Sequence, residues 1–295
     1  MDHAYGSSGL AEKRLALPHD RFAAMKGYNG RRRGAGLVGI LRGIVGTERS
    51  DAGDAQLGLT LCFVAGAMNA GGLLAVGQYT SHMSGIVSAL ADNLVLGRGN
   101  LIVVGLGSVL FFVAGAACSA FLINWGRRHH TPNQYALPLL FEAALLLGFG
   151  LIGHLRVHGP VFGVIAVPLL CFIMGLQNAI ITKISRARIR TTHVTGMVTD
   201  LGIELGKLFY RNKSGDEDHS PVIADRKKLK LLGSLLSSFI IGGVVGALGF
   251  KYVGFPAVVP LAILLLLLAG LPMADDFLAK RNRSLQAGCN HDAKP

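Results

Sequence analysis

A polar phrase made of hydroxyl residues, a histidine and a glycine occurs twice in the chain, each time shortly after a long apolar run. The first copy is TSHMSG at 80–85 and the second is TTHVTG at 191–196. Hydroxyls and glycine let a chain leave helical geometry at membrane depth, because hydroxyls bond freed backbone groups and glycine accepts unusual dihedrals. The phrases therefore predict two broken or re-entrant helical segments that bind a solute. The predicted binding residues are Thr80, Ser81, His82, Ser84, Thr191, Thr192, His193 and Thr195.

The repeated histidine is the strongest reason to assign chemistry to these phrases. Ser and Thr alone are good helix N-caps, and a histidine can lie at the membrane interface without a further role. A purely structural cap, however, does not need His82 and His193 at the same place in both copies. Polar groups in transmembrane regions mark pathways, so the duplication favours a pore or substrate site.

An asparagine precedes each phrase inside the apolar run. FVAGAMNA at 63–70 matches FIMGLQNA at 172–179, so that Asn69 corresponds to Asn178. Asparagine carries both a donor and an acceptor, and in membranes it serves either to join helices or to contact a solute. Gln177 makes the second run more polar still, so we include Asn69, Gln177 and Asn178 in the predicted binding site.

Glu142 is the acidic residue that lies well inside an apolar run, LPLLFEAALLLG at 137–148. A buried carboxyl group in a membrane pairs, carries a proton or lines a pathway. Glu142 is therefore the candidate for a proton-linked residue, and one of the histidines, with an ordinary pKa near 6.5, is a candidate partner.

The composition places these residues in a membrane protein. The 295 residues are 51% hydrophobic and 16% charged, whereas soluble domains are about 25% charged. A membrane-crossing helix needs about 20 apolar residues, and six runs qualify. They lie near 56–77, 101–124, 134–155, 160–182, 229–250 and 254–274.

Two shorter pieces, 84–97 and 195–209, decide the predicted topology, because they are too short to cross comfortably. If they crossed, the cationic loops GRRHH at 126–130 and KISRARIR at 183–190 would lie opposite the Arg-rich N-terminal segment, against the positive-inside rule. Six spans instead give three per half, so the two copies are inverted relative to each other. This is the architecture of many secondary transporters.

The predicted fold is an all-α integral membrane protein with about six transmembrane helices, arranged as two inverted three-helix repeats, each with a short broken or re-entrant helical segment. The predicted divisions are a flexible basic cytoplasmic tail at 1–50, a membrane domain at 51–278 with repeat 1 at about 55–156 and repeat 2 at about 160–275, and a cytoplasmic tail at 279–295. Within the second short piece, Asp200, Glu204 and Lys207 share one helical face, which we interpret as a solvated face beside the cytoplasm, with an ion site as the alternative.

Several function classes are not expected. The formal charge of +12 comes from basic residues that bracket apolar runs, which is typical of membrane topology rather than of nucleic-acid binding. The four cysteines show neither a disulfide framework nor metal-ligand spacing. Nucleophile-elbow, phosphate-loop, dinucleotide and zinc-protease motifs are missing, so we expect no enzyme, no metal and no cofactor.

The phrases NAGGLLAVGQYTSHMSGIV at 69–87 and MGLQNAIITKISRARIRTTHVTGMVTDLGIELGKL at 174–208 resemble the YoaK family of bacterial membrane proteins, a domain of unknown function. The similarity covers roughly 55–275, and its second phrase is the more specific. The resemblance implies a bacterial inner-membrane protein with about six helices, and it brings no substrate, cofactor or catalytic residue.

These observations predict a secondary transporter of a small solute or ion, working by alternating access between the two repeats, in the bacterial inner membrane with both termini cytoplasmic. Its partners are the lipid bilayer and an unidentified solute or ion, and assembly into a homo-oligomer is left open. Two alternatives remain: a channel with the same polar lining, and a membrane scaffold or sensor in which the motifs only hold helices together. Paired haem ligation by His82 and His193 is a weaker one.

Overall fold

The computed structural model describes residues 51–129, 134–155, 160–184, 192–210 and 221–270. Within these ranges every regular element is a helix, and there is no β-strand. The helices are α2 (Asp51–Val76), α3 (Met83–Val95), α4 (Gly99–Arg128), α5 (Ala136–His154), α6 (Pro160–Ile184), α7 (Val194–Phe209) and α8 (Arg226–Tyr252), followed by the 3-10 turn η3 (Phe255–Ala257). This turn opens a further apolar helical stretch, Phe255–Gly270. The all-helical prediction is confirmed, and the predicted tails lie outside the described residues.

Five of the described helices, α2, α4, α5, α6 and α8, are long and apolar enough to cross a membrane. They coincide with five of the six predicted runs. The sixth run, 254–274, extends past the described residues, and its described part is the shorter Phe255–Gly270 helix. Helices α4 and α8 expose many large apolar side chains, a surface that soluble proteins rarely carry. The chain therefore has the helices of a multi-pass membrane protein.

The four central helices share a Phe-x-x-Gly sequence that brings their backbones together in two pairs. In each pair, the glycine of one helix lies against the backbone carbonyl of the other helix's phenylalanine, where a Cβ would overlap the oxygen. The contacts are Gly66 on Phe239 and Gly242 on Phe63 in the α2–α8 pair, and Gly115 on Phe172 and Gly175 on Phe112 in the α4–α6 pair. Small residues permit this close packing within membranes.

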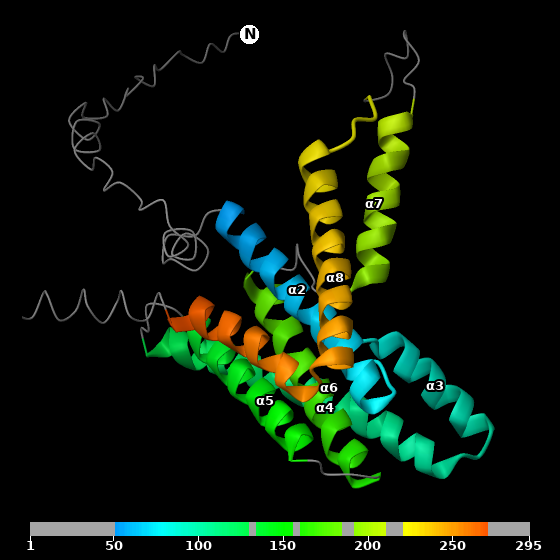
Figure 1. Ribbon diagram of the computed structural model, residues 1–295. Helices are drawn as coiled ribbons and strands as arrows, with labels where there is room; N and C mark the ends of the chain where they lie inside the picture. The colour runs from blue at the N-terminus through cyan, green and yellow to red at the C-terminus, as the bar shows by residue number, and fades with distance from the viewer. Residues whose placement is uncertain (1–50, 130–133, 156–159, 185–191, 211–220, 271–295) are drawn as a thin grey trace, which may run out of the picture.

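The direction of the helices relates the two halves. Helices α2 and α8 run parallel, since Ser238 Oγ donates to the Leu59 carbonyl and Gly71 lies against Phe250 further along both helices. Figure 1 shows α2 and α6 running in opposite directions through the body of the molecule. Helix α2 of the first half thus packs against α8 of the second half, and α6 of the second half packs against α4 of the first half. These two contacts hold the halves together.

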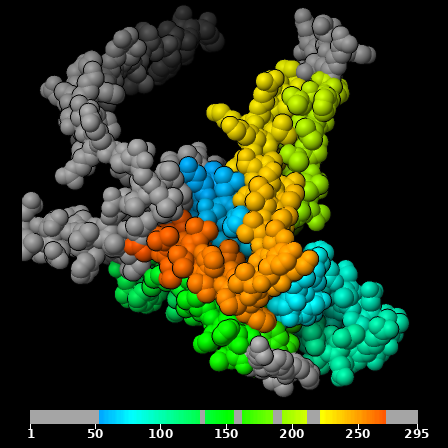
Figure 2. All heavy atoms as spheres, in the orientation of Figure 1, coloured from blue at the N-terminus to red at the C-terminus, as the bar shows by residue number. Residues whose placement is uncertain are grey.

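The predicted short pieces are present as the short helices α3, of 13 residues, and α7, of 16 residues. Helix α3 folds back on α4, and α7 packs against α8. Helix α3 with the start of α4, and α7 with the first half of α8, project from the body of the molecule (Figure 1), and Figure 2 shows α7 and the first half of α8 standing clear of it.

Candidate functional site

The two histidine phrases adopt the same local structure. His82 is the N-cap of α3, with φ −88° and ψ 71°, and His193 is the N-cap of α7, with φ −83° and ψ 58°. The carbonyl of each histidine accepts a hydrogen bond of 3.1 Å from the backbone N–H four residues later, at Ile86 and Met197. Each phrase therefore starts a short helix in the same way.

The hydroxyl residue before each histidine donates a hydrogen bond to the asparagine of the preceding long helix. Ser81 Oγ donates to Asn69 Oδ1 at 2.7 Å, and Thr192 Oγ1 donates to Asn178 Oδ1 at 2.8 Å. The Asn178 side chain also donates to the carbonyl of Met174 at 2.8 Å. Each asparagine thus fixes the return of the chain after its helix ends, which explains the repeated spacing of asparagine and hydroxyl.

The glycine of each phrase leaves room for the histidine ring. A Cβ at Gly85 would lie 2.7 Å from His82 Nδ1, and a Cβ at Gly196 would overlap His193 Nδ1. Each imidazole therefore folds back over the first turn of its own helix. Both histidine side chains are exposed on the chain, so they are accessible to a ligand.

The remaining predicted residues differ in burial. Thr80, Ser81 and Gln177 are buried, whereas Ser84 and Thr195 are exposed, and Thr191 lies outside the described residues. Thr80 Oγ1 has no hydrogen-bond partner. Among the described binding residues, Ser81 bonds Asn69 within the first half and Thr192 bonds Asn178 within the second half.

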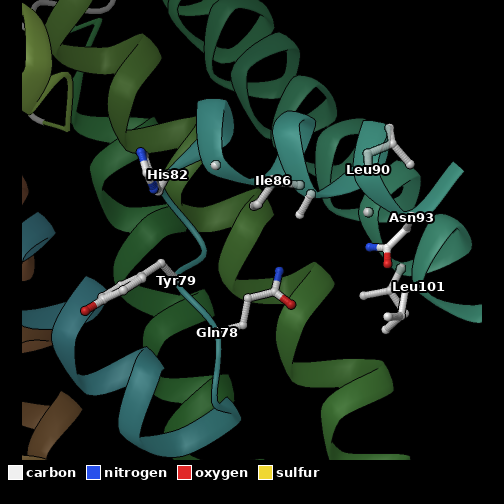
Figure 3. Close-up of a pocket in the computed structure, with 11 residues that line it drawn as sticks. Gln78, Tyr79, His82, Ile86, Leu90, Asn93 and Leu101 are labelled. Carbon is white, nitrogen blue, oxygen red and sulfur yellow. The ribbon is translucent and has the colours of Figure 1, made fainter. Parts of the chain in front are cut away.

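A pocket of about 390 Å³ opens beside the first phrase, between the 77–82 link, α3 and α4 (Figure 3). Among the predicted binding residues, only His82 lines it. The lining residues are Gln78, Tyr79, His82, Gly85, Ile86, Ala89, Leu90, Asn93, Leu101, Val104 and Gly105. Sequence reasoning missed Gln78 and Asn93, although Gln78 lies two residues before the phrase.

Glu142 and Gln177 form a buried polar pair between α5 and α6. Both residues have 0% of their surface exposed. Gln177 is the polar side chain next to the Glu142 carboxyl group, yet none of their four polar atoms makes a hydrogen bond within 3.5 Å. Buried polar groups are nearly always paired, so this pair is a candidate for a function rather than for stability.

The second hairpin carries a charged cluster that replaces the predicted solvated face. Glu204 has only 2% of its surface exposed, so that interpretation was wrong for this residue. The backbone N–H of Asp225 donates to Glu204 Oε2 at 3.0 Å and Lys207 Nζ donates to Oε1 at 3.1 Å, with Lys228 Nζ at 3.6 Å. The bond from the Asp225 N–H, then that from Lys207, hold the pKa of Glu204 below its usual value, and burial opposes this shift.

Among the described residues, no group of three His, Cys, Asp or Glu side chains converges as metal ligands would. The candidate site consists instead of hydroxyls, carboxamides, imidazoles and one buried carboxyl group. Such groups bind solutes through hydrogen bonds and exchange protons.

The model of a protein family described as "Protein of unknown function (DUF1275)" matches residues 57–271. The chain belongs to the DUF1275 family. The YoaK family is a DUF1275 family, so the resemblance is confirmed. The DUF1275 match includes both histidine phrases, the pocket and Glu142. Neither the curated proteins nor the solved structures yield a match to the chain.

Proposed function

We propose that this DUF1275 protein is a secondary transporter of a small solute or ion, and not an enzyme. One observation carries the proposal: the asparagine–hydroxyl–histidine element is built twice, on the ends of two helices, α2 and α6, that run in opposite directions. A site assembled from inverted copies of one element suits alternating access, because each copy can serve one side of the membrane.

The proposed topology has six spans. Helices α3 and α7 rise about 20 and 24 Å, at about 1.5 Å per residue, which is short of a hydrocarbon core of about 30 Å. They therefore lie at the membrane faces or enter it partway, and the 254–274 run completes the sixth span. The positive-inside rule then places both termini in the cytoplasm of a bacterial inner membrane.

The mechanism follows from the hydrogen bonds that hold each phrase. When the bond between Ser81 and Asn69, or between Thr192 and Asn178, breaks, a solute can take its place. A solute carbonyl can accept from the freed hydroxyl, and a solute hydroxyl can donate to the freed asparagine oxygen. Each half therefore has one hydrogen bond, here called its latch, that opens when solute binds and re-forms when solute leaves. Glu142, buried beside Gln177 without a cation, is proposed to carry the proton that couples the two states.

Two other functions remain in competition. A channel would use the same polar residues but would give flux that neither saturates nor depends on a counter-ion. A scaffold or sensor is favoured by one specific observation, that each asparagine–hydroxyl bond joins residues only 12 or 14 positions apart. Bonds of this kind stabilise a chain turn even without a solute.

The inverted topology is tested with two single cysteines at matching exposed positions, Ser84→Cys and Thr195→Cys, in a variant whose native cysteines are replaced by serine or alanine. A membrane-impermeant maleimide is applied to right-side-out and to inverted vesicles. We expect the two cysteines to react from opposite sides. Reaction of both from one side overturns the inverted arrangement.

Transport itself is tested in proteoliposomes under an imposed pH gradient, with currents and internal pH followed for a panel of amino acids, sugars, organic acids and alkali cations. We expect saturable flux of one class, lost in His82→Ala and in His193→Ala. Thr199→Ala is the matched control, since this exposed hydroxyl only bonds the Thr195 carbonyl of its own helix. Folded variants with unchanged flux, or no flux of any compound through the intact protein, overturn the proposal.

A further inference from the structure

The pocket beside His82 has a counterpart position in the second half of the chain. Helix α3 matches α7 through the histidine phrases, and α4 matches α8 through their Phe-x-x-Gly sequences. These two registers pair the pocket residues with residues of the second half, and four of the pairs bear on the pocket. Ala89 corresponds to Asp200, Asn93 to Glu204, Leu101 to Lys228 and Gly105 to Leu232.

In the second half, an ion cluster and a leucine occupy the matching positions between the two helices. Lys228 Nζ lies 3.6 Å from Asp200 Oδ2 and 3.6 Å from Glu204 Oε1, and Leu232 is buried where the first half has a glycine. In the first half, Asn93 and Leu101 stand in place of Glu204 and Lys228, and Gly105 stands in place of Leu232. The space there is open. The pocket is therefore a specific difference between two copies of one hairpin.

The lining combines apolar side chains with the Gln78 and Asn93 carboxamides, the Tyr79 phenol and the His82 imidazole. None of the described residues that line the pocket is Asp, Glu, Lys or Arg. Figure 3 shows the Gln78 and Asn93 carboxamides directed toward the space from the link and from α3, with Ile86, Leu90 and Leu101 around them. Each carboxamide provides a donor and an acceptor, and a volume near 390 Å³ lies at the lower end of ligand pockets, about 300–1,000 Å³.

We propose that this pocket binds an uncharged, compact amphiphile: an apolar body that carries one amide or hydroxyl group, which Gln78 and Asn93 orient. An ionic ligand would lose water without gaining a carboxylate, ammonium or guanidinium partner, because the described lining contains no Asp, Glu, Lys or Arg. This binding site does not depend on the transport proposal.

Three probes of the same shape and different charge test the ligand class: 2-phenylacetamide, phenylacetate and 2-phenylethylammonium. Full-length protein carries Ala89→Cys at the pocket wall in a background without native cysteines, and the alkylation rate by N-ethylmaleimide is measured with each probe. We expect 2-phenylacetamide to slow alkylation saturably, with an apparent affinity at least tenfold tighter than either ion.

Two glycines of α4 provide the matched variants. Gly105→Leu reproduces the second-half residue and should abolish protection by 2-phenylacetamide, whereas Gly107→Leu, at a position with nothing within 4 Å, should retain it. Asn93→Asp should reverse the preference, so that 2-phenylethylammonium protects best. This reversal requires a folded pocket and so confirms that the ligand contacts Asn93.

Three results overturn the inference: no protection by 2-phenylacetamide, equal protection by all three probes, or undiminished protection in Gly105→Leu. A lipid chain in the pocket would also overturn the inference. In that case alkylation would be slow in the absence of any probe, and it would become faster after delipidation. Protection with no measurable flux contradicts only the transport proposal, and flux with no protection contradicts only the pocket.

Discussion

In the α3–α4 hairpin, Asn93 lines an open pocket beside Gly105, whereas at the matching place in the α7–α8 hairpin Glu204 is held by Lys228 beside a buried Leu232. The two hairpins begin with the same histidine N-cap and the same asparagine–hydroxyl bond. The duplicated sequence therefore preserves the backbone plan of the hairpin and varies the side chains between its two helices. A binding surface has room to change while the turn that supports it stays the same.

The helix pairs show the same division between shared and varied features. The four glycine–carbonyl contacts occur in both pairs, because close backbone approach tolerates no side chain. Glu142 and Gln177, by contrast, have no polar counterparts. Gln177 corresponds to Met68, and alignment of Pro138 with Pro260 places Leu264 opposite Glu142.

The largest expected effect tests the shared contacts. Gly66→Ala and Gly175→Ala should each cost about 3 kcal/mol of folding stability, because the new Cβ overlaps a backbone carbonyl that cannot move without separating the helices. The measurement is the thermal unfolding midpoint in detergent, with Gly107→Ala as a control of no crowding. If only one of these two substitutions lowers the unfolding midpoint, the α2–α8 and α4–α6 pairs are not equivalent.

The next effect exchanges the polar pair for the residues of the opposite half. Glu142→Leu combined with Gln177→Met should raise stability by about 1–3 kcal/mol, because both polar groups are buried without hydrogen bonds. Proton-coupled flux should be lost in the same protein. Glu142→Gln keeps a buried polar group and should give no stabilisation, and a destabilised double variant would show that the pair has a structural role.

Sequence patterns predicted the elements better than their contacts. Apolar length identified the five long helices, and the duplicated phrase predicted equal local structures at His82 and His193, because both signals are local. The partners of these elements depend on surfaces far apart in the chain, as when Gly66 meets Phe239. The pocket forms only after α4 folds back on α3, and Glu204 is buried only because α8 covers it, so neither was visible in helical periodicity.

The charged cluster of the second hairpin predicts a pH dependence that the first hairpin lacks. The pKa of Glu204 is lowered from its ordinary 4.5, mainly by the Asp225 N–H, and that of Asp225 is lowered from 3.8, mainly by the Lys228 N–H. Ionised Glu204 therefore stabilises the α7–α8 contact above about pH 4.5, and this contribution is lost as the pH falls through the lowered pKa.

Glu204→Gln gives the second hairpin a carboxamide, as the first has at Asn93. We expect its unfolding midpoint to lie a few degrees below that of the intact protein at pH 7, and the two midpoints to converge as the pH falls from 5 to 3. Asp92→Asn, an exposed acid on α3, is the control and should show no such convergence. If the two unfolding midpoints differ by the same amount from pH 5 to pH 3, then Lys207 and Lys228 do not stabilise Glu204 through its charge.

The smallest effects concern the bond that both halves share. Ser81→Ala and Thr192→Ala should each cost about 1 kcal/mol, because the asparagine Oδ1 loses one hydrogen bond near the membrane. The exchange variants Ser81→Thr and Thr192→Ser retain the hydroxyl and should change the free energy of unfolding by less than about 0.5 kcal/mol. If the alanine variants lose as little stability as the exchange variants but abolish flux, the bond is a latch of the transport cycle. If stability and flux decline together in both halves, the bond serves the turn alone, and the difference in function between the halves resides in the pocket and the ion cluster.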